Sequence, residues 1–252
     1  MLGSQQRAYA TRPKLATEAS VRIFDFFGAL FLLFLLAPLI VFISIGIVVD
    51  SRGPILYGAT RVGRNGRAFR MLKFRKMGAH AQGPPLTVAS DGRFTRLGGL
   101  LARTKLDELP QLWNVVKGDM SLVGPRPEDI AFVDLFRKDY DEILSVPPGI
   151  TGLSQLAFAK ESQLLATEDN HRYYVERLLP QKIAIDRLYS RRRSLLLNLQ
   201  ILFWTAVVVS LIGDVAVNRT SGRLTLRRRH RQPEVLAEPA TAAAGAEAAV
   251  NE

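Results

Sequence analysis

The sequence predicts a small mixed α/β domain that associates with a membrane through apolar helices. Three observations support this prediction: an apolar run interrupted by a proline (24–49), an Asn65-Gly66 hairpin signal, and a second apolar run (195–213). The 252 residues suffice for one substantial core and a small appendage. A formal charge of +11 indicates an anionic partner such as a nucleic acid, a membrane face or a phosphorylated substrate.

We expect the chain to start with a basic segment (1–20) and to continue into a membrane segment (21–50). As a helix, the apolar run would be about 39 Å long, against roughly 30 Å for the hydrocarbon core of a bilayer. No small-residue cleavage site follows it, so a signal peptide is disfavoured. Asp25 is its one charged residue.

Pro38 lies in the middle of this segment and predicts a kink or a break, because proline lacks the N–H that a helix needs. Lysines and arginines flank both ends of the segment, so the positive-inside rule does not choose an orientation. Two arrangements satisfy these facts, a re-entrant helix that leaves by the face it entered and a kinked helix that spans the bilayer.

The middle of the chain reads as strands and short helices. Residues 53–57 resemble a short strand, residues 63–77 a hairpin around Asn65-Gly66, and residues 94–106 a short helix. No acidic residue occurs between Ser51 and Ser90, which predicts a cationic surface. This surface is either a solvated face or a site for phosphates or lipid headgroups.

An acidic pair, Asp107-Glu108, stands out in this basic chain. Pro110 suits the first turn of a helix and Gly118 its end, so the pair lies at the N-terminal mouth of that helix. Free N–H groups there favour negative charge, and capping alone explains many such acids. The alternative is catalysis, in which one carboxylate holds a divalent metal and the other attacks an electrophile.

A strand-like segment (119–123) and a rigid turn (124–128) follow this helix. In the turn, Pro125 and Pro127 flank Arg126 and restrict the backbone around it. A guanidinium held in this way suits bidentate phosphate binding, while a structural salt bridge, for example to Glu128, is the alternative.

The second apolar run (195–213) has arginines on both sides. We expect a helix that lies in the membrane interface, with a buried core helix as the alternative. Beyond it, residues 214–252 read as a basic and then alanine-rich tail that we expect to be disordered.

The composition excludes further kinds of site. The chain has no cysteine, which excludes disulfides, thiolate catalysis and cysteine-bound zinc. His80, His171 and His230 are far apart in sequence, which disfavours a histidine metal site. No RNA- or DNA-binding motif is recognisable, so we expect no nucleic-acid partner.

The segment "LDELPQLWNVVKGDMSLVGPRPE" (106–128) resembles the signature of the bacterial sugar transferases that load a polyprenyl phosphate carrier, the monotopic phosphoglycosyl transferases. Three further segments resemble the family in the same order: "KFRKM" (73–77), "PPGITGLSQL" (147–156) and "DRLYSRRRSLLLNLQIL" (186–202). The resemblance covers about residues 20 to 210.

The resemblance implies that residues 51–213 form a catalytic domain that transfers sugar 1-phosphate from a UDP-sugar to polyprenyl (undecaprenyl) phosphate. Asp107 would attack the sugar-linked phosphorus, forming a phosphosugar-aspartate and releasing UMP, and the polyprenyl phosphate would then attack this intermediate. Glu108 would bind Mg²⁺. The expected phosphate- and substrate-binding residues are Lys73, Arg75, Gln111, Arg126 and Asp186.

The resemblance also implies a location and a pathway class. The membrane helix would be re-entrant, breaking near Pro38, with the catalytic domain on the cytoplasmic face of the bacterial inner membrane. The product would initiate exopolysaccharide, capsule, O-antigen or other glycoconjugate assembly. A homodimer through the 195–213 helix is a further hypothesis.

The chain departs from the family pattern at several positions. Pro147 stands where arginine or lysine is usual, residues 157–162 replace a Gly-Arg-Asn segment, and Asn198 and Gln200 replace aspartate and lysine. Two other functions stay open: a relative that binds its ligands without turnover, and a basic protein that binds membrane surfaces. The intact Asp107-Glu108 pair favours catalysis over both.

Overall fold

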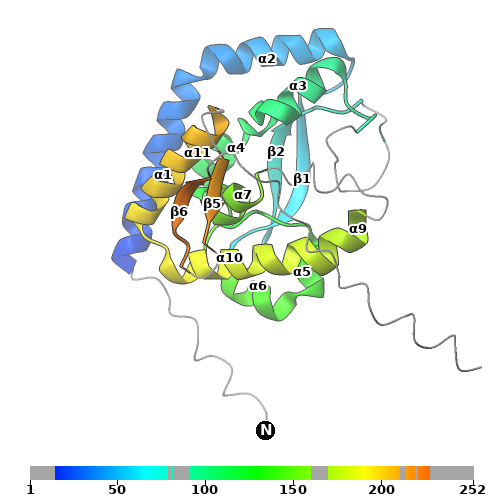
Figure 1. The fold of residues 1–252 in the computed structure, drawn as a ribbon. Coiled ribbons are helices and arrows are strands. Elements are labelled where there is room, and N and C mark those ends of the chain that lie inside the picture. The colour runs from blue at the N-terminus through cyan, green and yellow to red at the C-terminus, as the bar shows by residue number, and fades with distance from the viewer. Residues whose placement is uncertain are drawn as a thin grey trace, which may run out of the picture.

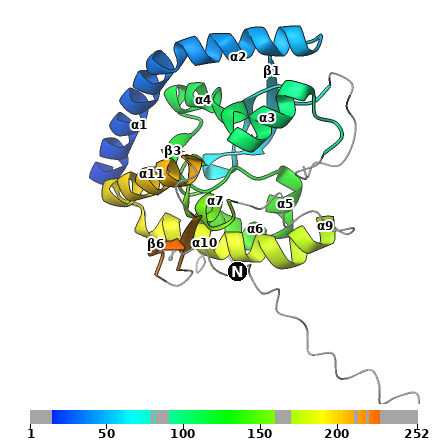
Figure 2. The ribbon, with the colours of Figure 1, turned by 45° about the horizontal axis from the view of Figure 1, so that its top comes forward.

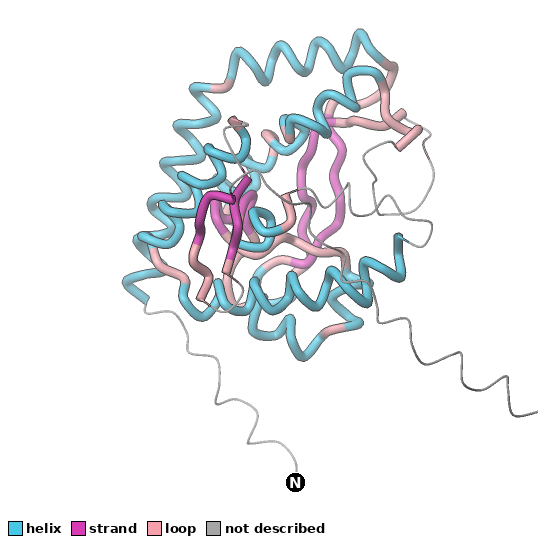
Figure 3. The backbone as a smooth tube through the Cα atoms, in the orientation of Figure 1, coloured by secondary structure: helices cyan, strands magenta, loops and turns pink. Residues whose placement is uncertain are grey.

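The computed structural model describes residues 15–78, 81, 91–159, 170–210, 214–218 and 221–227. The first part of the basic segment (1–14) and the alanine-rich end of the tail (228–252) lie outside the described residues. Of the 157–162 departure, residues 157–159 are described and residues 160–162 lie outside the described residues. Within these described ranges, helices pack around three pairs of strands (Figure 3).

Two helices, α1 (Leu15–Leu35) and α2 (Ala37–Asp50), frame one side of the molecule (Figure 1). The pair is bent by 62°. Leu36 lies between the helices and Pro38 lies in the first turn of α2, where its missing N–H is tolerated. Within the described part of the chain, no single helix is long and apolar enough to cross a bilayer, although the bent pair passes that test together.

One face of the α1–α2 pair is buried and the other exposes large apolar side chains. Asp25, the one charge in this run, is buried against β3 (Ser121–Val123). Its carboxylate accepts a 2.6 Å hydrogen bond from Ser121 Oγ and a 3.0 Å bond from the Leu122 N–H. The exposed face includes Phe27, Phe31, Phe34, Phe42, Ile45 and Val49.

The predicted hairpin is confirmed. Strands β1 (Leu56–Val62) and β2 (Ala68–Phe74) pair antiparallel. The turn between them places Asn65 at φ 59° and Gly66 at φ 76°, the left-handed conformations that an Asn-Gly pair favours. The strand expected at 53–57 begins later, at Leu56, and continues to Val62.

The next elements also follow the sequence pattern. Helix α3 (Arg96–Thr104) and helix α4 (Gln111–Lys117) form where helices were expected. Gly118 ends α4 at φ 93°. Strand β3 forms within the strand-like segment and pairs in parallel with β4 (Gly149–Thr151).

The remaining helices pack around these strands. They are α5 (Ile130–Leu135), α6 (Arg137–Ile143), α7 (Leu153–Ala157), α9 (Asn170–Tyr173), a π-helical segment (Tyr174–Leu178) and α10 (Leu179–Arg192). Helix α10 lies at the end of the molecule opposite α2 in both ribbon views (Figures 1 and 2).

Helix α11 (Leu195–Val209) has both a buried side and an exposed apolar side. Asn198 and Ile201 are fully buried, so one side belongs to the core. Leu196, Phe203 and Val209 are exposed on the same helix, which gives it an apolar outer face as well. The helix ends at Val209, and residues 211–213 lie outside the described part.

The predicted disorder from residue 214 onwards is wrong for the first part of the tail. Strands β5 (Asp214–Val217) and β6 (Leu224–Arg227) form an antiparallel hairpin that packs on α7. Val215 is buried, and Val217 and Leu224 pack against the core. Apolar residues that alternate with polar ones let one face of this hairpin cover the core, so the domain extends beyond residue 213.

Candidate active site

The acidic pair lies in one 3₁₀ turn, Leu106–Glu108, between α3 and α4. Lys105 joins α3 to this turn in the left-handed conformation, at φ 61°. Pro110 stands directly before the first residue of α4. The pair therefore sits just ahead of the N-terminus of α4, as the sequence predicted.

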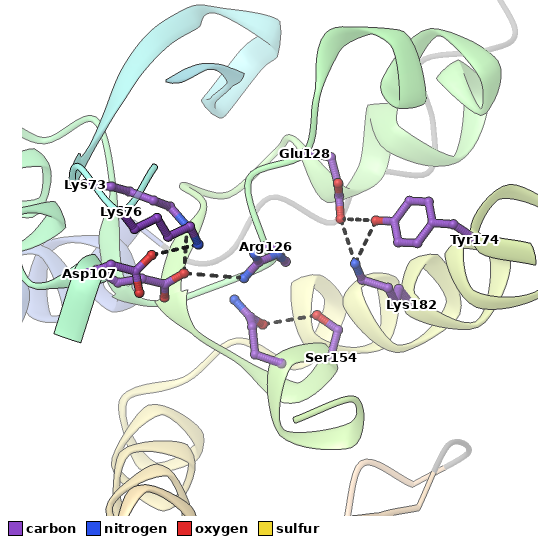
Figure 4. Close-up of polar contacts among 10 residues, drawn as sticks. Lys73, Lys76, Asp107, Arg126, Glu128, Ser154, Tyr174 and Lys182 are labelled. Carbon is purple, nitrogen blue, oxygen red and sulfur yellow. Dashed lines mark hydrogen bonds and ion pairs between the residues drawn. The ribbon is translucent and has the colours of Figure 1, made fainter. Parts of the chain in front are cut away.

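Each carboxylate of the pair has its own lysine. Lys73 Nζ lies 2.8 Å from Glu108 Oε1, and Lys76 Nζ lies 3.0 Å from Asp107 Oδ2. Both lysines come from the end of the β1–β2 hairpin (Figure 4). The Asp107 side chain is 2% exposed and that of Glu108 is 14% exposed, so the ion pairs are well shielded from water.

Arg126 approaches the pair from the opposite side, on the loop that follows β3 (Figure 4). Its guanidinium NH1 lies 4.0 Å from Glu108 Oε1. Burial raises the pKa of Glu108, but the charges of Lys73 and Arg126 outweigh it and lower that pKa to about 2. Glu108 is therefore ionised at any physiological pH.

The cluster formed by Lys73, Lys76, Asp107, Glu108 and Arg126 carries three cations and two anions. Its net positive charge suits a phosphorylated ligand. Its two carboxylates offer a nucleophile and an oxygen ligand beside that ligand. The expected substrate-binding residues Lys73 and Arg126 are thus brought together with the acidic pair.

Asp186 lies behind this cluster, on α10, and is buried. The Ser154 hydroxyl and the backbone N–H of Arg126 lie close to its carboxylate, while its Oδ1 has no hydrogen-bond partner among the described residues. Burial raises the pKa of Asp186 to about 7, although Ser154, the positive charge of Lys182 and the Arg126 N–H act in the opposite direction. Asp186 therefore lies beside the backbone of Arg126, and among the described residues no hydrogen bond or ion pair joins it to the acidic pair.

Gln111, the first residue of α4, is buried, and its Nε2 has no hydrogen-bond partner among the described residues. A buried donor without a partner is costly, so this amide is a candidate for binding a ligand oxygen.

Arg75 does not join the site. Its guanidinium donates to the carbonyl oxygens of Arg52, Ser51 (2.6 Å) and Ile47 (3.5 Å), at the end of α2. Strand β2 ends at Phe74, so the alternation of side chains that would group Arg75 with Lys73 stops there. The structure brings Lys76 to Asp107 instead, and the sequence reasoning missed this residue because the end of the strand was not defined.

The oxygen donors of the site fit a magnesium ion that binds together with a substrate. Over the described residues, no three acidic or histidine side chains form a ready-made metal cage. Mg²⁺ is commonly held by one or two carboxylates, with substrate phosphates and water completing its shell. Glu108 meets this requirement, although its Oε1 also contacts Lys73.

We expect the stability of the protein to fall as the pH rises towards about 7, and the Asp186→Asn variant to lose part of this dependence. The folded-state pKa of Asp186, about 7, lies above the ordinary aspartate pKa of 3.8. Between these values the folded state holds a proton that the unfolded state releases, so the free energy of unfolding decreases with pH. Melting temperatures of both proteins at pH 5 and pH 8 test this. Equal pH dependence in the two proteins would contradict it.

Comparison with known proteins gives evidence on the family of this chain that is independent of the geometry of the site. Residues 16–211 match the family model described as bacterial sugar transferase. The chain is 38% identical over 198 residues to a UDP-glucose:undecaprenyl-phosphate glucose-1-phosphate transferase of Caulobacter vibrioides, which covers 77% of this chain and 70% of that protein. It is 35% identical over 195 residues to the exopolysaccharide production protein PSS of Rhizobium leguminosarum bv. phaseoli, covering 74% and 92%.

Some relatives are much longer. The undecaprenyl-phosphate glucose phosphotransferase of Komagataeibacter xylinus is 37% identical over 193 residues, which cover 73% of this chain and 34% of that protein. The match to the family model decides the family of the chain, because it spans most of the described domain and includes the acidic pair and Arg126. The chain belongs to the bacterial sugar transferase family.

Proposed function

We propose that this enzyme transfers a sugar 1-phosphate from a UDP-sugar to polyprenyl phosphate. The observation that carries the proposal is the Asp107-Glu108 pair enclosed by Lys73, Lys76 and Arg126. Several relatives are named as transferases of sugar 1-phosphates onto undecaprenyl phosphate. Their names differ in the sugar, which is glucose in one and N-acetylgalactosamine in another, so the donor sugar has to be found by experiment.

In the proposed reaction, an Asp107 carboxylate oxygen attacks the phosphorus that carries the sugar. The bond between this phosphorus and the bridging oxygen breaks, and UMP leaves with the bridging oxygen. A phosphate oxygen of the polyprenyl phosphate then attacks the phosphosugar-aspartate, and the carboxylate of Asp107 is restored. Both steps form one P–O bond and break another, so no further reactant is required.

The surrounding cations would neutralise the phosphates. Lys76 pairs with Asp107, so we propose that its ammonium group moves to the donor phosphate when the donor binds. Lys73 and Arg126 approach Glu108 from two sides and would contact the same phosphates. A bound Mg²⁺, held by Glu108, would add further charge neutralisation on the phosphate oxygens.

We propose that the apolar faces of α1, α2 and α11 lie in the membrane and that α1 and α2 form a re-entrant pair. The 62° bend and the exposed apolar side chains on both helices support this arrangement. A lipid-linked acceptor presents its phosphate at the headgroup plane, so a shallow anchor would hold the active site at the height of the acceptor. The catalytic domain would then face the cytoplasm.

Because the chain has no cysteine, single cysteines report its topology directly. We expect Ser20→Cys on α1 and Arg52→Cys after α2 to react with a membrane-impermeant maleimide from the cytoplasmic side alone. Phe34→Cys, next to the bend and 82% exposed in the protein, should be protected from both sides by lipid. Labelling of positions 20 and 52 from opposite sides of inverted and right-side-out vesicles would establish a spanning helix and contradict re-entry.

Nucleotide release tests the proposed reaction. The purified protein in detergent is incubated with a panel of UDP-sugars, undecaprenyl phosphate and Mg²⁺, beside a sample with EDTA. We expect UMP, and we expect EDTA to abolish its release. UDP as the product would mean transfer of the sugar without its phosphate, and the proposed mechanism would be wrong.

A further inference from the structure

The loop between β3 and α5 (residues 124–129) carries Arg126 and is called the Arg126 loop below. A buried ionic cluster joins this loop to α10 and has no role in the reaction proposed above (Figure 4). Glu128 Oε1 accepts a 2.9 Å hydrogen bond from Tyr174 OH and a 2.9 Å bond from Lys182 Nζ. Lys182 Nζ also lies 2.8 Å from Tyr174 OH, to which it donates. The Lys182 and Glu128 side chains are only 3% and 9% exposed.

Stability alone does not explain such a cluster. Burying a lysine and a glutamate removes both charges from water, and well-packed apolar residues of similar size are often as stabilising as a buried ion pair. Apolar side chains surround this cluster, among them Phe132, Val133, Ile143 and Leu179. Apolar side chains could therefore have filled the positions of Lys182 and Glu128, and the two charges need an explanation other than stability.

Helix α10 contacts the Arg126 loop at two points. Lys182 binds the Glu128 side chain, and the carboxylate of Asp186, one turn further along α10, lies close to the backbone N–H of Arg126. Lys182 and Asp186 are four residues apart and therefore lie on one face of α10. This face approaches the loop on both sides of Pro127. The loop is also tied to the β3–β4 sheet, since the Gly149 N–H donates to the Pro125 carbonyl at 2.8 Å.

The π-helical segment explains how Tyr174 reaches the same carboxylate. In an α-helix, residues eight apart differ by about 80° around the axis, whereas residues seven apart differ by only about 20°. The π-helical turn at Tyr174–Leu178 accommodates one extra residue, so Tyr174 and Lys182 face the same side. Such turns are uncommon and often occur at functional sites.

We propose that Lys182 and Tyr174 are positioning residues that act through Glu128 to hold the Arg126 loop, so that the Arg126 guanidinium is aimed at the phosphates of the donor. This inference rests on the proposed function, because it assumes that Arg126 binds donor phosphate. Because Glu128, two residues further along, is held by α10 and Pro125 is held by Gly149, Arg126 binds with a side chain that needs little reorganisation.

Binding of UDP, which carries both phosphates of the donor, tests this inference without turnover. Calorimetry with Mg²⁺ compares the wild type with Arg126→Ala, Tyr174→Phe, Lys182→Met and the double variant Glu128→Gln/Lys182→Met. We expect Arg126→Ala to weaken UDP binding by about 10- to 100-fold, the range for a charge-assisted hydrogen bond. Lys182→Met and the double variant should weaken it by about tenfold, and Tyr174→Phe by less.

Two further measurements separate positioning from a general effect on the fold. In the Arg126→Ala background, Lys182→Met should cause no additional loss of UDP affinity, because the group it positions is gone. Arg187→Gln is the matched control: it lies on the same helix and breaks ion pairs with Asp139 and Glu142 away from the loop. It should bind UDP as the wild type does.

The outcomes distinguish this inference from the proposed function. A wild type that neither binds UDP nor releases UMP contradicts the proposed function itself. A wild type that does both, with Lys182→Met, Tyr174→Phe and the double variant all binding UDP normally, overturns the positioning role. Additive losses from Arg126→Ala and Lys182→Met overturn it as well. The double variant keeps the test valid if Lys182→Met fails to fold, because it leaves no unpaired buried charge on Glu128.

Discussion

Asp107→Asn is expected to abolish UMP release, with a loss of at least about 10³-fold, because the amide oxygen is a far weaker nucleophile than a carboxylate. The substitution keeps the shape of the side chain, and the amide oxygen still accepts a hydrogen bond from Lys76. The fold and the phosphate-binding cations should therefore be unchanged. The loss would belong to the chemical step.

Covalent labelling makes this prediction more specific than activity alone. Wild-type protein incubated with a UDP-sugar labelled in the sugar, without polyprenyl phosphate, should retain label after denaturation. Asp107→Asn should retain none. Asp134→Asn serves as the control, since Asp134 is exposed and pairs with Arg137 at the surface. It should label as the wild type does.

Glu108→Gln separates the roles of the two acids. We expect it to lose activity and to lose the response to added Mg²⁺, because an amide is a poor magnesium ligand. Glu108 is ionised above about pH 2, so its protonation should not shape the activity profile between pH 5 and 9. Label on Glu108 in the Asp107→Asn protein would mean that the two acids exchange the roles assigned to them.

Much of the local structure could be predicted because it depends on single residues with strong backbone preferences. Asn65-Gly66 forms the hairpin turn, and Gly118 ends α4. Pro38 lies in the first turn of the helix that follows the bend. In each case, the short-range chemistry of one or two residues decides the conformation, so packing does not override it.

The site required long-range information that no local pattern contains. Whether Arg75 or Lys76 faces the acidic pair depends on where β2 ends, one residue earlier than the alternation suggests. Glu128 and Lys182 form an ion pair although they are 54 residues apart in sequence. The Tyr174 hydroxyl reaches the same carboxylate because of a π-helical turn, which the sequence does not mark. The tail hairpin packs on α7 and α11, so its place depends on apolar surfaces that are distant from it in sequence.

The second large effect is expected at Asn114, a fully buried residue on α4 that completes the edge of the β1–β2 hairpin. Its Oδ1 accepts from the Leu72 N–H at 2.9 Å, and its Nδ2 donates to the Arg70 carbonyl at 2.9 Å. The amide thus acts towards β2 as a third strand would. Loss of both bonds leaves two backbone groups of β2 unpaired beside the helix.

Asn114→Ala should therefore lower the free energy of unfolding by about 2–4 kcal/mol, since each unpaired buried group costs about 1–3 kcal/mol. For a domain of this size, the melting temperature should fall by roughly 5–15 °C. Trp113→Ala is the control, because Trp113 is adjacent on α4 but 51% exposed. Its melting temperature in the same detergent should change by much less.

Activity should fall in Asn114→Ala as well, even well below its melting temperature, since Leu72 directly precedes Lys73, whose ammonium group pairs with Glu108. A β2 strand that is no longer bound to α4 would hold Lys73 less firmly against the acidic pair. If the variant melts with the Trp113→Ala control and releases UMP at the wild-type rate, the amide is dispensable. The hairpin would then owe its position against α4 to apolar packing, through residues such as Met71 and Leu112.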